Sequence, residues 1–143
     1  MRTGMTETAL TINAPVVITN DMIAGLLCTC LDGGYYRYWG VVEIAYKPTE
    51  EEINDKEKYG DWAGYPQYLV SHRNFKLRVL TSSGSYLYPP KITILKLSTL
   101  KKGLKVMAEK YPKHFKDFLI QNDDAITGDV FLQCCVEGKV IYG

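Results

Sequence analysis

Residues 20–34 read NDMIAGLLCTCLDGG, and this stretch decides the first element of the fold. Its apolar side chains repeat every four positions in two rows, Met22, Leu26, Cys30 and Ile23, Leu27, Leu31. Such spacing is typical of an amphipathic α-helix. Thr19 or Asn20 would cap its start, and Gly33-Gly34 would end it because glycine adopts the left-handed backbone conformation at little cost.

Outward from this helix, the chain alternates between strand-like and helix-like patterns. We expect strands at residues 35–47, 67–72, 75–81, 86–88 and 91–97, an edge strand at 8–13 and a terminal strand at 140–142. Residues 82–85 would form a hairpin turn between two of them. A helix would begin at Ser98 and be interrupted at Pro112, and a last helix would run from Asp124 to Gly138. The sequence therefore predicts an α+β fold, a small antiparallel sheet packed with about three helices.

The length and composition indicate one globular domain. The chain has 143 residues, of which 46% are hydrophobic and 23% charged, which excludes disorder as its main state. We expect a single domain over residues 1–143, with a polar surface insertion at about 47–66 that includes one helical turn at 49–55. The net charge of +1 gives no general attraction to nucleic acid or to anionic membranes.

The sequence shows neither a signal-peptide pattern nor 18 consecutive apolar residues, so we expect a cytoplasmic protein without a membrane partner. The four cysteines, Cys28, Cys30, Cys134 and Cys135, lack the spacing of a zinc site. We expect them to be reduced, buried side chains, and we expect no metal or other cofactor.

The main candidate binding residues follow the first helix. They are Tyr35, Tyr36, Arg37, Tyr38 and Trp39, which hold three of the eleven tyrosines. On a strand, Tyr35, Arg37 and Trp39 would share one face and Tyr36 and Tyr38 the other. Aromatic rings beside a guanidinium suit a planar ligand that carries phosphate. The alternative is that these tyrosines are ordinary sheet residues.

Four other residues are candidate ligand contacts. His72 and Arg73 lie between two predicted strands, where they would meet an anion. Asp124 is best placed as a helix N-cap, and Asp129 lies five residues further on, too far along one helix to share a metal with it. Either carboxylate would otherwise accept hydrogen bonds from ligand hydroxyls.

Residues 91–116 contain eight lysines and one glutamate. This basic stretch would either be an ordinary solvated helix face or hold an anionic partner. Because the sequence contains no recognisable nucleophile, metalloprotease or phosphate-loop motif, it offers no positive sign of an enzyme, and we expect none.

Residues 23–39 resemble the pattern LLxTALEGG…YW, and residues 124–143 resemble the pattern DAxTADVxLQ…FGEVVYG. In these two motifs the chain resembles a family of small uncharacterised bacteriophage and prophage proteins. The departures include Asp32 in place of Glu, Cys30 and Gly128 in place of Ala, and Glu137 in place of Phe. The resemblance implies a phage-encoded accessory protein and assigns no catalytic residue.

On that resemblance we expect a protein that counters bacterial immunity by sequestering a nucleotide-type immune signal, such as a cyclic ADP-ribose isomer or a cyclic oligonucleotide, as a homo-oligomer. The alternatives are a protein-binding inhibitor of a host defence effector, similar to an anti-CRISPR protein, and a virion or replication accessory.

Overall fold

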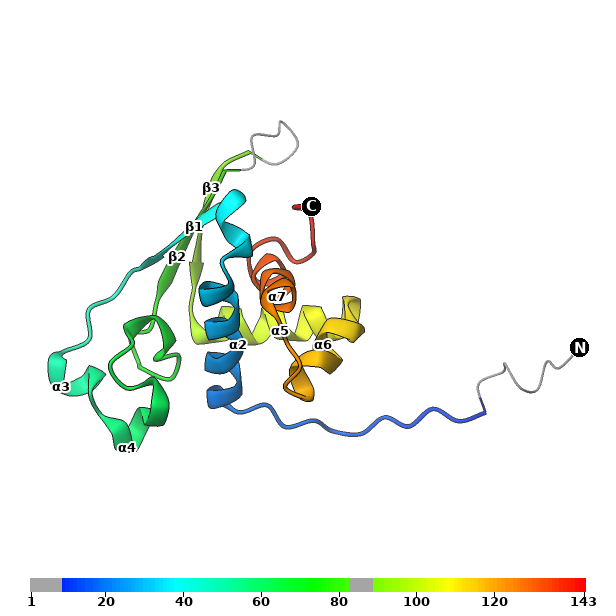
Figure 1. The fold of residues 1–143 in the computed structure, drawn as a ribbon, viewed down its shortest axis with the longest axis horizontal. Helices are drawn as coiled ribbons and strands as arrows, with labels where there is room; N and C mark the ends of the chain where they lie inside the picture. The colour runs from blue at the N-terminus through cyan, green and yellow to red at the C-terminus, as the bar shows by residue number, and fades with distance from the viewer. Residues whose placement is uncertain (1–8, 83–88) are drawn as a thin grey trace, which may run out of the picture.

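A three-stranded antiparallel sheet forms one layer of the protein, whose computed structural model describes residues 9–82 and 89–143 (Figure 1). The strands are β1 (Gly40–Ile44), β2 (Leu77–Thr81) and β3 (Lys91–Leu95), in the spatial order β1-β2-β3. Val42 pairs with Val79, which pairs with Thr93. The inner face carries the fully buried Leu77, Val79 and Leu95.

Three long helices form the second layer. They are α2 (Asn20–Gly33), α5 (Leu97–Lys110) and α7 (Ala125–Glu137), and the shorter α6 (Pro112–Leu119) connects α5 with α7. Helix α7 packs against both α2 and α5 (Figure 1), and every residue from Thr127 to Cys134 is buried. The predicted α+β fold is confirmed.

The predicted insertion at residues 47–66 is largely helical. It contains the single-turn helices α3 (Glu50–Ile53) and α4 (Lys56–Tyr59) and the 3₁₀ turn η2 (Gly60–Trp62), and η3 (Pro66–Tyr68) follows. Its Trp62 indole N–H donates to the Asp21 carboxylate at 2.7 Å, and the Tyr46 hydroxyl donates to the Pro66 carbonyl at 2.6 Å. These bonds fasten the insertion to α2 and to the end of β1.

The predicted caps of α2 and α7 are confirmed. The Thr19 hydroxyl accepts from the Met22 N–H at 3.1 Å, and the Asp124 carboxylate accepts from the Thr127 N–H at 3.0 Å. Gly34 and Gly138 end these helices with φ of 74° and 73°, where a side chain would be strained. The predicted cap at Ser98 is wrong: α5 begins at Leu97 with Lys96 as its N-cap, and Ser98 lies inside the helix.

Several predicted strands are wrong. Residues 35–38 form the 3₁₀ helix η1 (Tyr35–Tyr38), because the left-handed Gly34 turns the chain so that its carbonyl accepts from the Arg37 N–H at 3.1 Å. Residues 67–72 form η3 and turns, and residues 140–142 are held outside any sheet. Residues 9–13 pair with none of the three described strands. Thr8, the strand predicted at 86–88 and most of the turn at 82–85 lie outside the described residues.

Glycines set how closely the helices approach each other. A Cβ built on Gly103 of α5 would overlap Cys135 of α7, and one built on Gly128 of α7 would lie 2.5 Å from the Cα of Cys30 in α2. The helices therefore cross with backbone nearly in contact. None of the helices among the described residues has the length and apolar character needed to cross a bilayer.

Candidate functional site

The 3₁₀ conformation of η1 divides the aromatic run differently from a strand. Residues three apart share a side of a 3₁₀ helix. Accordingly, Tyr36 and Trp39 are buried, with 8% and 1% of their surfaces exposed, whereas Tyr35 and Tyr38 are 49% and 63% exposed. Arg37 is exposed beside them. The predicted grouping of Tyr35, Arg37 and Trp39 is therefore wrong, and the solvent-facing group is Tyr35, Arg37 and Tyr38.

These three residues border a surface hollow of about 760 Å³, which we call the aromatic hollow. Its lining includes Tyr35, Arg37, Tyr38, Ile126, Asp129 and Tyr142. Its volume lies inside the range of roughly 300–1,000 Å³ that is usual for ligand sites. Within the described part of the chain, the Arg37 guanidinium has no ion pair. Partial desolvation and the nearby Asp129 carboxylate raise the pKa of the Tyr38 phenol.

A buried polar network underlies the hollow. Asp129 accepts from the Trp39 indole N–H at 2.8 Å and from the Gln133 amide at 2.9 Å. Gln133 in turn accepts the backbone N–H groups of Ile141 and Tyr142, both at 2.9 Å. The Trp39 and Tyr142 rings stack with centroids 4.6 Å apart. The network joins Trp39 at the end of η1, helix α7 and the C-terminal residues into one continuous floor.

Asp124 lies outside the lining of this hollow and serves as the N-cap of α7. Its hydrogen bonds to the Thr127 backbone lower its pKa. His114 Nδ1 lies 3.3 Å from the Thr127 hydroxyl, which also donates to Asp124. This acid, hydroxyl and imidazole group does not make a nucleophile, because Thr127 is only 1% exposed.

His72 and Arg73 belong to a different region. His72 Nε2 lies 2.9 Å from Glu52 in α3, and Arg73 donates to the same carboxylate oxygen at 2.6 Å. A bond from the Thr49 backbone, together with Arg73 and His72, lowers the pKa of Glu52 to about 2. The two predicted anion contacts thus already have an acidic partner within the chain, and that partner holds the insertion.

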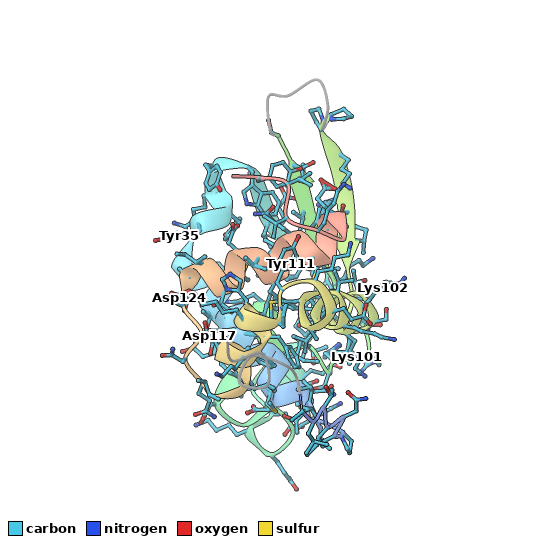
Figure 2. All side chains as sticks on the ribbon, turned by 90° about the vertical axis from the view of Figure 1, so that its right-hand side faces the viewer. Tyr35, Lys101, Lys102, Tyr111, Asp117 and Asp124 are labelled. Atoms are coloured by element: carbon cyan, nitrogen blue, oxygen red, sulfur yellow. The ribbon has the colours of Figure 1, made fainter. Side chains whose placement is uncertain are left out.

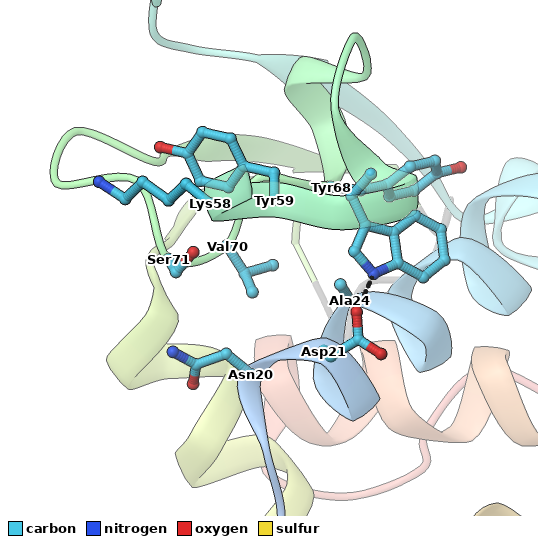
Figure 3. A pocket seen from close by; sticks show the side chains of 9 residues that line it. Asn20, Asp21, Ala24, Lys58, Tyr59, Tyr68, Val70 and Ser71 are labelled. Carbon is cyan, nitrogen blue, oxygen red and sulfur yellow. Dashed lines mark hydrogen bonds between the residues drawn. The ribbon is translucent and has the colours of Figure 1, made fainter. Parts of the chain in front are cut away.

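A second cavity lies between α2 and the insertion (Figure 3). Asn20, Asp21, Lys58, Tyr59 and Tyr68 border it, and its volume is about 220 Å³. Trp62 also lines it, and the hydrogen bond from the Trp62 indole to Asp21 is the dashed line in Figure 3. This volume is below the usual range for a ligand the size of a nucleotide.

The lysine-rich stretch does not reach the aromatic hollow through α5. Figure 2 shows Tyr35 at one side of the molecule, above Asp124, and Lys101 and Lys102 at the opposite side. Lys91 instead pairs with Glu137. Lys101 and Lys102 therefore lie too far round the molecule to contact a phosphate in the hollow.

The four thiols are free and poorly suited to nucleophilic chemistry. Burial raises the pKa of Cys28 and of Cys135, raises that of Cys134 to about 11, and raises that of Cys30 further. Among the described residues, no group of three or more His, Cys, Asp or Glu side chains is arranged to hold a metal ion.

Sequence reasoning missed Gln133 and Tyr142, which line the hollow and order its floor. A glutamine within the buried run of α7, four residues after Asp129, was the available signal, because residues four apart share one side of a helix.

Searches against protein-family models, curated proteins and solved structures gave no significant match to this chain.

Proposed function

We propose that the protein binds a nucleotide-type molecule in the aromatic hollow and releases it chemically unchanged. The observation that carries this proposal is the meeting of Tyr35, Arg37, Tyr38 and Asp129 around one hollow of about 760 Å³. A tyrosine ring would stack on the base, and the Arg37 guanidinium would pair with phosphate oxygens. Asp129 has lone pairs beyond its two bonds and would accept a ribose hydroxyl.

Sequestration without turnover fits the chemistry of the described residues. His72 lies within hydrogen-bond distance of Glu52, and His114 lies within hydrogen-bond distance of Thr127. The thiols have raised pKa values. Combined with the phage-like end motifs, this favours capture of a nucleotide-type immune signal, a cyclic ADP-ribose isomer or a cyclic oligonucleotide. In this role the protein is a cytoplasmic anti-defence factor of a phage.

The experiment is calorimetric titration of the full chain with cyclic ADP-ribose isomers, cyclic dinucleotides and cyclic trinucleotides. Arg37→Ala should weaken binding about tenfold to a hundredfold, because a hydrogen bond to a charged group contributes roughly 1.5–3 kcal/mol. Lys101→Ala removes the same charge on the opposite side of the molecule and should change the affinity little. Recovery of the ligand with altered mass would refute binding without turnover.

A second candidate is inhibition of a host defence protein through the same rim. Exposed tyrosines with an arginine, here Tyr35, Tyr38 and Arg37, are typical of interaction hot spots. If no nucleotide of the panel binds at concentrations that saturate ordinary nucleotide sites, the sequestration proposal fails. Loss of a captured host protein on Tyr38→Ala would then support the second candidate.

A further inference from the structure

Two unpartnered apolar features account for most of the exposed large hydrophobic side chains that the structure describes. Leu10, Ile12, Val16 and Val17 lie in the extended residues 9–18, and Val41, Ile44, Ile92 and Ile94 lie on the two outer strands of the sheet. Together they are eight of the thirteen such residues. An exposed apolar segment and an incompletely covered sheet in the same chain call for an explanation.

Strand β1 is an open edge. Its ladder to β2 is bounded by bonds from the Ser82 N–H to the Trp39 carbonyl and from the Ala45 N–H to the Lys76 carbonyl, both 2.9 Å. Because residues of an antiparallel strand point alternately toward and away from their partner, the backbone groups of Val42 and Ile44 point away from β2. No further strand pairs there among the described residues.

The same edge lacks side-chain cover. Ile44, Leu77 and Leu95 form one row across the inner face of the sheet. Leu77 and Leu95 are fully buried, but Ile44 is 46% exposed. In this row the inner face is therefore covered at β3 and uncovered at β1, where one more strand with inward apolar residues would cover it.

Residues 9–13 have the sequence of that missing strand. Leu10 and Ile12 alternate with Thr11 and Asn13, and Pro15 would end pairing because it lacks an N–H. Leu10 and Ile12 are 74% and 75% exposed, and residues 9–19 carry no charge. The segment is as long as β1, five residues.

We propose that two copies of this chain exchange these segments, residues 9–13 of each copy adding as a fourth strand to the free edge of β1 in the other. Leu10 and Ile12 would cover Val42 and Ile44. In Figure 1 the segment extends from the start of α2 toward the opposite side from β1, which favours a second copy over the same chain as the acceptor. The exchange is reciprocal, so it closes as a two-fold dimer and leaves no segment unpaired. It does not rest on the proposed nucleotide binding.

The test is sedimentation equilibrium of the full chain and of two arm variants. The wild type should be a dimer in the micromolar range. The double variant Leu10→Glu/Ile12→Glu should raise the dimer dissociation constant by at least about a hundredfold, because it places carboxylates against apolar side chains. The matched variant Thr11→Glu/Asn13→Glu adds the same charge on the solvent side and should change it little.

The acceptor edge is tested separately. Ile44→Glu should dissociate the dimer, whereas Ile94→Glu, on the outer face of β3, should not. Hydrogen exchange at the Val42 and Ile44 amides should be slow in the dimer and fast in Leu10→Glu/Ile12→Glu. A monomeric wild type, a dimer that survives Leu10→Glu/Ile12→Glu, or one that Ile94→Glu breaks and Ile44→Glu spares would overturn the proposal. Circular dichroism of each variant confirms that the fold is retained.

Discussion

Replacing Gly103 by alanine tests whether the crossing of α5 and α7 depends on glycine. The added Cβ would overlap the Cys135 Sγ, and it would lie 2.8 Å from the Cys135 Cα and 2.9 Å from its backbone nitrogen. The thiol can rotate, but the backbone of α7 can move only if the helices separate. Overpacking of this kind destabilises by up to about 3 kcal/mol. The better helix propensity of alanine offsets about 1 kcal/mol of this.

We therefore expect Gly103→Ala to lower the free energy of unfolding by about 2 kcal/mol, measured by urea denaturation. Gly25→Ala in α2 is the matched control, since its Cβ would meet only Trp62, at an ordinary 3.8 Å. This control should gain up to about 1 kcal/mol from helix propensity. Equal effects of the two substitutions would refute the reasoning, because they would show that backbone proximity at Gly103 costs nothing.

Four further predictions concern the polar groups. Asp129→Asn turns an amide N–H toward the Trp39 indole N–H or the Gln133 amide, so one of the two hydrogen bonds is lost. The free energy of unfolding in urea should fall by about 1–3 kcal/mol, and an unchanged value would contradict the buried network. Asp124→Ala removes the N-cap of α7 and should cost about 1 kcal/mol in the same assay. The pKa of Glu52 is lowered to about 2. The stability that its ionised carboxylate contributes is therefore complete above the unfolded pKa near 4.5 and is lost as the pH falls through about 2. The difference in the free energy of unfolding between wild type and Glu52→Gln should shrink as the pH falls from about 4.5 to about 2. At pH 8 the native thiols should react with a disulfide reagent much more slowly than after denaturation, because burial raises their pKa values.

The helices could be predicted from the sequence because local signals determine them. The four-residue repeat from Met22, the cap at Asp124 and the glycine at 138 each act within a few positions, and the structure has α2 and α7 where these signals place them. The residues after Gly34 were misassigned because β-propensity and 3₁₀ turns both accommodate tyrosine. The left-handed Gly34 starts the 3₁₀ turn, and a tertiary contact holds its end: Trp39 enters the core and its indole reaches Asp129, 90 positions away.

The candidate site was predictable only in part for the same reason. Arg37 and the tyrosines were recognisable as a cluster, but which rings face solvent depends on the helical period of η1 and not on composition. His72 and Arg73 contact Glu52, a residue of the insertion that spacing alone could not assign to them as a partner. Short-range sequence patterns therefore predict the secondary structure, but they do not predict the partners of charged residues, because those partners lie on segments distant in the sequence.

The structure also separates two kinds of residue at the aromatic hollow, and this decides how its function can be tested. Asp129 and Tyr142 belong to the floor, whose hydrogen bonds and stacking hold the C-terminal residues against Trp39. Substituting them removes folding interactions together with any ligand contact, so lost binding would be ambiguous. Arg37 and Tyr38 belong to the rim and are exposed. A rim substitution that abolishes binding while the urea midpoint stays unchanged therefore supports a direct contact between the rim and the ligand.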